Sequence, residues 1–216
     1  MLLQTTATQT KNLWETVIDG GFLMIPLAIL LLISIYIFIE RCLVISRAVQ
    51  PDRNLMKRIR ESVQEGDIEN AERLCKKNDS PYSRLIMRGI SRIGRPTQEV
   101  MGAIENTGNI EISRLSKGLA WLSTTAAGAP MIGFLGTVVG MMQSFDSMAS
   151  KGTAVSITDL GGGISMALIT TVAGLVVGIL ALFAYNYLAA RLGKILTNME
   201  TTTMEFMDML NEPAAL

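Results

Sequence analysis

The stretch that decides the fold is residues 118–190, which read GLAWLSTTAAGAPMIGFLGTVVGMMQSFDSMASKGTAVSITDLGGGISMALITTVAGLVVGILALFAYNYLAA. Within it, only Asp146, Lys151 and Asp159 carry a charge. A membrane helix needs about 20 residues, because a rise of about 1.5 Å per residue must cover a hydrocarbon core of about 30 Å. Both uncharged parts of the stretch meet this length. They predict two membrane-spanning helices.

A third apolar segment, residues 22–39, lies near the N-terminus. No small-residue cleavage pattern follows it, and the arm before it lacks the basic region of a secretory signal. We therefore expect a retained membrane helix here. The predicted fold class is an all-α polytopic membrane protein with three transmembrane helices.

The orientation is predicted from Lys and Arg residues near the helix ends, which mark the cytoplasmic side. Such residues cluster after the first span, before the second and after the third, whereas the other side has only Lys11 and Lys151. The predicted segments are a periplasmic N-terminal arm (1–19), transmembrane helix 1 (20–40), a cytoplasmic helical loop (41–117), transmembrane helix 2 (118–146), a periplasmic loop (147–160), transmembrane helix 3 (161–190) and a cytoplasmic C-terminal helix and tail (191–216).

The long loop is expected to form short amphipathic helices, since apolar residues such as Leu55, Ile59 and Val63 recur at three- and four-residue spacing. Helix-breaking residues divide it. Apolar residues keep helical spacing beyond Arg191, so the third helix is expected to extend into the cytoplasm, and the second is also longer than a bilayer requires. The predicted breaks are Pro51, Gly66-Asp67, Asp79-Ser80-Pro81 and Gly94-Arg95-Pro96.

The composition argues against an enzyme. The chain has no His, and its 19 basic and 19 acidic residues give a net charge of zero, so neither the commonest general base nor an electrostatic signal for nucleic acid is present. Cys42 and Cys75 are too far apart for metal-ligand spacing and are interpreted as structural thiols. We expect no catalytic residues, no metal and no cofactor.

Small and hydroxyl residues fall on one side of each of the last two predicted helices. Such residues let membrane helices approach closely, and threonine hydroxyls can hydrogen-bond within or between helices. The pattern is compatible with helix packing alone and with a polar path for water, ions or protons. No carboxylate lies at membrane depth, so the titrating group of a proton path would belong to another chain. The helix-packing candidates are Gly133, Gly136, Gly140, Gly174 and Gly178.

Three segments together resemble the ExbB and TolQ proteins of proton-driven bacterial motors, within the MotA/TolQ/ExbB superfamily. The first is residues 134–140 (FLGTVVG). The second is residues 163–175, which contain Gly163-Ile164, the run ALITT at residues 167–171 and Gly174-Leu175. The third is Tyr185-Asn186 followed by Arg191. The three-helix layout, the outside N-terminus and the long first cytoplasmic loop are also similar to that family.

The resemblance implies a ring-shaped homopentamer in the bacterial inner membrane, in contact with membrane lipid. Its second and third helices would surround a pore that holds a dimer of an ExbD-like single-span protein, whose aspartate supplies the titrating group. Thr137 and Thr171 match the threonines that face this aspartate, with Thr170 adjacent. Proton passage would energise a TonB-like protein for transport across the outer membrane. The subunit-interface candidates are Tyr185, Asn186 and Arg191.

The sequence departs from the family at Met166, where many members have a glutamate one turn before the third-helix threonine. A close alternative is a TolQ-like subunit of the Tol-Pal envelope system, which would use the same proton path with different downstream partners. Alternatives from other classes are a stand-alone ion channel or transporter, and a scaffold whose cytoplasmic helices bind a protein.

Overall fold

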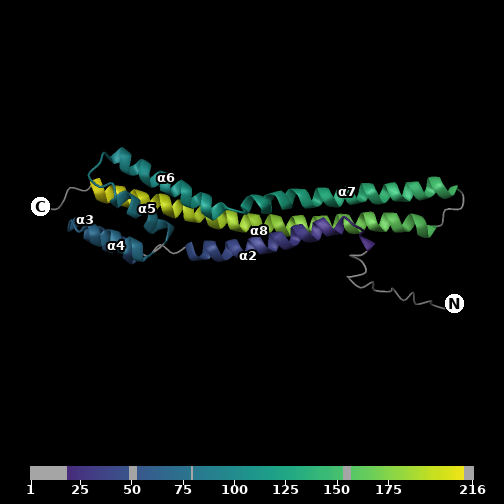
Figure 1. Ribbon diagram of the computed structural model, residues 1–216, viewed down its shortest axis with the longest axis horizontal. Coiled ribbons are helices and arrows are strands. Elements are labelled where there is room, and N and C mark those ends of the chain that lie inside the picture. The colour runs from purple at the N-terminus through teal and green to yellow at the C-terminus, as the bar shows by residue number, and fades with distance from the viewer. Residues whose placement is uncertain (1–18, 49–52, 79, 153–156, 212–216) are drawn as a thin grey trace, which may run out of the picture. The chain divides into compact units, whose positions relative to one another are not determined.

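The computed structural model describes residues 19–48, 53–78, 80–152 and 157–211, and its described part contains seven helices and no strand (Figure 1). The all-α fold class is therefore confirmed. Three of the helices are long and apolar enough to cross a membrane. The helices are α2 (Met24–Ala48), α3 (Arg53–Gln64), α4 (Ile68–Lys77), α5 (Pro81–Ile90), α6 (Thr97–Ser116), α7 (Leu119–Lys151) and α8 (Ile157–Asn211).

The chain divides into two compact units. The first, here called the membrane unit, contains residues up to 36 together with residues 121–185. The second, here called the loop unit, contains residues 37–120 and those from 186 onward. The helices α2, α7 and α8 each contribute residues to both units.

The core of the membrane unit is built by one apolar side chain from each of its three helices. Leu27 of α2, Ala129 of α7 and Val177 of α8 are buried against one another, and partly buried apolar neighbours surround them. The outward faces remain apolar and exposed, for example at Phe134 and Val172. A face of this kind needs lipid or another protein as its surroundings.

The loop unit contains the short helices that the sequence predicts. The breaks at Gly66-Asp67, Ser80-Pro81 and Gly94-Arg95-Pro96 are confirmed, whereas Pro51 and Asp79 lie outside the described residues. Gly66 and Gly94 have positive φ angles of 76° and 87°, which glycine adopts without steric cost.

Side-chain caps begin two of these helices. The Asp67 carboxylate accepts a hydrogen bond from the Asn70 amide at 3.0 Å, and the Ser80 hydroxyl accepts one from the Ser83 amide at 3.1 Å. Each cap satisfies one of the amide donors left unpaired at a helix N-terminus.

The helix α8 continues beyond Arg191 to Asn211, as its apolar spacing predicts, and the apolar face of this part is buried in the loop unit. Phe206 is fully buried against Gly89 of α5, where a Cβ atom would lie 2.5 Å from the Phe206 ring and 2.9 Å from Ile104 of α6. Ile195 and Met199 are buried as well. The third long helix is thus a structural part of the loop unit.

An ion cluster joins α5 to α6. Glu111 is buried, and its carboxylate accepts hydrogen bonds from Arg84 at 3.0 and 2.7 Å and from Arg114 at 3.1 Å. A buried carboxylate is costly to desolvate unless it is paired in this way. The Arg114 carbonyl in turn accepts a hydrogen bond from Arg41 of α2 at 3.1 Å.

We expect Glu111→Ala to destabilise the loop unit by about 1–3 kcal/mol, because it removes the buried carboxylate that accepts hydrogen bonds from Arg84 and Arg114. The apparent melting temperature of the purified protein should fall. Glu65→Ala, which removes an exposed carboxylate, is the matched control and should leave that temperature unchanged. Equal melting temperatures for the two variants would show that the cluster does not stabilise the unit.

Burial raises the pKa of the Cys75 thiol to about 11, with a smaller contribution from the nearby Glu72 carboxylate. The thiolate is the reactive form, so in a Cys42→Ser background Cys75 should react with maleimide about 100-fold more slowly at pH 8 than after unfolding. Because the folded pKa of the Cys75 thiol exceeds its unfolded pKa, the protonated thiol contributes to the free energy of unfolding. That contribution is complete below about pH 9 and is lost as the pH rises towards 11. Equal labelling rates before and after unfolding would contradict the burial of α4.

Candidate functional site

Within the membrane unit, α7 and α8 lie side by side (Figure 1), and small residues bring their backbones close together. A Cβ atom added at Gly133 would lie 3.0 Å from the Thr170 carbonyl oxygen, and one at Gly140 would lie 2.6 Å from the Gly163 carbonyl oxygen. One at Gly174 would lie 2.6 Å from the carbonyl oxygen of Ala129. Side chains at these positions would force the helices apart, which is the physical role of small residues in membrane helix packing.

The remaining packing candidates lie in the same seam. At Gly136, a Cβ atom would lie 2.5 Å from Cβ of Thr170. At Gly178, it would lie 2.6 Å from Cγ of Pro130, so the absent side chain leaves space for the proline ring inside α7. All five predicted packing glycines therefore contact the facing helix.

Thr170 is fully buried in this seam. Its hydroxyl lies against Gly136 and donates to the carbonyl oxygens of Met166 and Ala167, both at 3.0 Å. The hydroxyl is thus satisfied by its own helix, as is common for threonine in membrane helices. Its surroundings are those of a packing residue.

Thr171, the next residue, has a different environment. It is half-buried, and its hydroxyl can donate to the Gly133 carbonyl oxygen across the seam at 3.2 Å or to Ala167 within α8 at 3.1 Å. Thr137 is also half-buried and donates to the Phe134 carbonyl oxygen at 2.6 Å. It lies one turn, about 6 Å along α7, from the residue that Thr171 contacts.

These hydroxyls can serve a proton path. A threonine hydroxyl carries one donor and two acceptor lone pairs, so each of these hydroxyls can still accept a hydrogen bond while it donates to a carbonyl. A water molecule or a protonated carboxyl group could be the donor. After rotation, the same hydroxyl could donate to a carboxylate.

The chain does not place a carboxylate beside these threonines within its described residues. Asp146 is exposed and lies nine residues beyond Thr137, about 13 Å along the helix. The side chain of Asp159 lies outside the described residues. In the described part of the chain, no group of three or more His, Cys, Asp or Glu residues is placed to hold a metal ion.

Met166 occupies the place where the resemblance suggested a glutamate. Its side chain contacts Gly21, which precedes α2 and has a φ angle of 71°. A side chain at Gly21 would meet both the methionine and a strained backbone. This place is therefore an apolar contact between α8 and the start of α2.

The three interface candidates do not form a cluster. Tyr185 is half-buried, Asn186 is exposed, and Arg191 lies over Tyr187 with its guanidinium 5.3 Å from the ring centroid. Arg191 also donates to the Tyr187 hydroxyl at 2.8 Å. The Tyr187 ring packs at a tilt on Phe38 of α2, with 6.1 Å between centroids.

Sequence reasoning missed Tyr187, although its spacing of four residues from Arg191 is a signal for a side-chain pair on one helix face. The Phe38 contact has no such signal, because it joins distant parts of the chain.

This geometry defines a multi-pass helical membrane protein with a small-residue seam and two half-buried threonines. The sequence confirms and refines that class, because the model of the MotA/TolQ/ExbB proton channel family matches residues 77–201, more than half of the chain. The chain belongs to this family.

Individual relatives carry the names ExbB and TolQ. The chain is 28% identical to an ExbB-like 1 protein of Synechocystis sp. over 85% of its own length and 73% of the relative. It is 31% identical to the Tol-Pal system protein TolQ of Pseudomonas aeruginosa over 62% of each chain. It is 34% identical to the biopolymer transport protein ExbB of Xanthomonas campestris, over 45% of this chain and 38% of the relative.

Gly136→Ala should destabilise the membrane unit, because the added methyl group would overlap Thr170; overpacking of this kind costs about 1–3 kcal/mol. Gly162→Ala is the matched control, since a Cβ atom there meets nothing within 4 Å. Melting of both variants in the same detergent tests the seam. Equal melting temperatures would contradict the close approach of α7 and α8.

Proposed function

We propose that this protein is the ExbB-like subunit of a proton-driven motor and is not an enzyme. It conducts protons together with a second, single-span protein and energises transport across the outer membrane. The observation that carries the proposal is the pair Thr137 and Thr171, half-buried hydroxyls on two adjacent helices of a chain that belongs to a proton channel family.

The subunit forms a homopentamer whose α7 and α8 helices surround the partner's membrane helices. The exposed apolar faces of α7 and α8, which include Phe134, Leu135 and Val172, support such an assembly because they need lipid, neighbouring subunits or the partner against them. A dimer of an ExbD-like protein occupies the pore. Asn186, which is exposed, is available for a contact between subunits, whereas Arg191 is already engaged by Tyr187.

The partner's aspartate takes up and releases the proton. Desolvation favours its neutral form, while the Thr137 and Thr171 hydroxyls and nearby water stabilise the ionised form. The two forms can then be close in free energy. Each proton that crosses 100 mV releases about 2.3 kcal/mol, which is available to move the partner relative to the ring.

Thr170 has a different role in this proposal. Because it is fully buried between α7 and α8 within one subunit, it holds the seam and does not contact the partner. The polar path therefore needs only Thr137 and Thr171, and no relay through the position of Met166.

The orientation follows from the distribution of basic residues. The N-terminus lies in the periplasm, and the loop unit lies in the cytoplasm of a cell whose inner membrane contains the complex. The downstream partner is a TonB-like protein.

A TolQ-like role in the Tol-Pal envelope system is the second candidate, favoured by the similarity to TolQ of Pseudomonas aeruginosa. The same proton path serves both roles. A stand-alone channel or transporter has less support, because the described residues offer no charged group beside the two threonines.

Thr137→Val and Thr171→Val should each lower proton uptake by about tenfold or more, since each removes a hydroxyl that stabilises the partner's carboxylate. The measurement uses proteoliposomes that contain the complex with its single-span partner, an imposed potential and a pH-sensitive dye. Thr201→Val is the matched control, because Thr201 is exposed in the loop unit and its hydroxyl donates to the Thr197 carbonyl oxygen of the same helix.

The native mass of each variant complex must match that of the wild type, so that a loss of uptake is not a loss of assembly. Normal uptake in both threonine variants would overturn the assignment of the path. A wild-type protein that is not pentameric and does not bind the single-span partner would overturn the motor proposal itself.

A further inference from the structure

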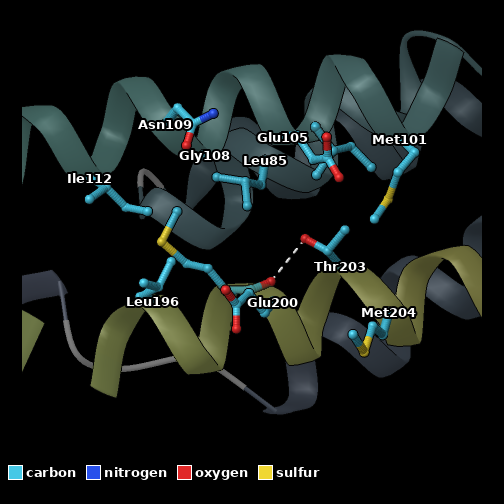
Figure 2. A pocket seen from close by; sticks show the side chains of 12 residues that line it. Leu85, Met101, Glu105, Gly108, Asn109, Ile112, Leu196, Glu200, Thr203 and Met204 are labelled. Carbon is cyan, nitrogen blue, oxygen red and sulfur yellow. Dashed lines mark hydrogen bonds between the residues drawn. The ribbon is translucent and has the colours of Figure 1, made fainter. Parts of the chain in front are cut away.

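A groove runs between α6 and the C-terminal part of α8 in the loop unit (Figure 2). It consists of two adjoining depressions of about 370 and 470 Å³. Met101, Glu105 and Met204 line both depressions, so the two form one continuous groove. This groove has no part in the proton path described above.

The floor of the groove is apolar and adaptable. Leu85 of α5 and Ile104 of α6 line it and are themselves buried. Met101 of α6 and Met204 of α8 line it from the two helices (Figure 2), and Met199 of α8 also lines it. Met204 is 62% exposed. Methionine side chains are flexible and polarisable, and they are common at surfaces that bind helices of varied sequence.

The charged residues that line the groove, among those the structure describes, are all acidic. They are Glu105 of α6 and Glu200 and Asp208 of α8. All three carboxylates are exposed, and none forms an ion pair with another described residue. By contrast, Glu99 and Glu111 on the same helix α6 are paired with arginines.

The dimensions suit a helix. The lining residues on α6 extend from Thr97 to Ile112, which is about 22 Å, or roughly four turns, at a rise of about 1.5 Å per residue. Amphipathic helices bind in such grooves through apolar residues spaced three and four apart.

We propose that this groove binds a cationic amphipathic helix of a partner protein. Its apolar face would lie on the methionine-lined floor, and its Lys or Arg residues would face the three carboxylates. Complementary charge of this kind favours the cognate partner and rejects acidic surfaces, including anionic lipid headgroups.

A second copy of the chain fits the groove less well than a partner protein. The apolar residues of the basic helices in the described loop unit are buried or half-buried, and Ile59 of α3, Leu74 of α4 and Ile86 of α5 are fully or almost fully enclosed. Among the described residues, these helices therefore offer no free apolar face to a neighbouring copy.

The test uses the full-length protein in nanodiscs and a fluorescent helical peptide of about 16 residues, with Leu at helical spacing and Lys elsewhere. The same peptide with Glu in place of Lys is the probe control. We expect saturable binding of the Lys peptide only. The charge variant Glu105→Gln/Glu200→Gln/Asp208→Asn should weaken binding by about tenfold or more.

Two matched controls separate the groove from general electrostatic attraction. Glu61→Gln/Glu65→Gln/Glu69→Gln removes the same number of charges from α3, the turn after it and α4, and should leave binding unchanged. Gly108→Leu places a side chain in the groove without changing charge and should also weaken binding, whereas Gly193→Leu, outside the groove, should not.

Equal weakening by the two charge variants, or full binding by Gly108→Leu, would overturn the proposal. Absence of saturable binding to the wild type would also overturn it. In that case, a disulfide between copies of Met204→Cys in a Cys42→Ser/Cys75→Ser background would assign the groove to a second copy. These results do not depend on proton conduction.

Discussion

The close approach of α7 and α8 is the constraint on which the membrane unit depends. Carbonyl oxygens and Cα atoms of one helix occupy the space that side chains would take on the other, at Gly133, Gly140 and Gly174. This spacing lets the Thr171 hydroxyl reach the Gly133 carbonyl across the seam. It also encloses Thr170 completely. The same glycines that pack the helices therefore decide which threonine is enclosed and which is only half-buried.

The two units differ in where their apolar side chains lie. In the membrane unit, the exposed side chains are mostly apolar, as expected for surfaces that meet lipid or other proteins. In the loop unit, α8 supplies buried residues such as Ile195 and Phe206, and the paired Glu111 joins α5 to α6. The groove between α6 and α8 differs from both, because its carboxylates form no ion pair with the described residues and apolar residues such as Met204 are exposed in it.

The three long apolar helices and the described helix breaks were predictable because each depends on residues close together in the sequence. The different environments of Thr170 and Thr171 were not, since adjacent residues on a helix point about 100° apart and only the facing helix decides which is enclosed. The Arg84–Glu111 pair joins residues 27 positions apart, and the Met166–Gly21 contact joins more distant ones. No local pattern contains that information. The groove was missed for the same reason, although both of its helices were expected.

α8 is one continuous helix from Ile157 to Asn211, so the number of residues between two of its positions sets the angle between the faces on which they lie. One stretch must direct Gly174 and Gly178 towards α7, and a later stretch must direct Ile195 and Phe206 into the loop unit. Inserting or deleting one residue between them would rotate the later stretch by about 100° and move it by about 1.5 Å relative to the earlier one. A change of seven residues would nearly restore the angle but would leave a displacement of about 10 Å. Single substitutions can be accommodated in this part of the helix far more easily than any change in its length.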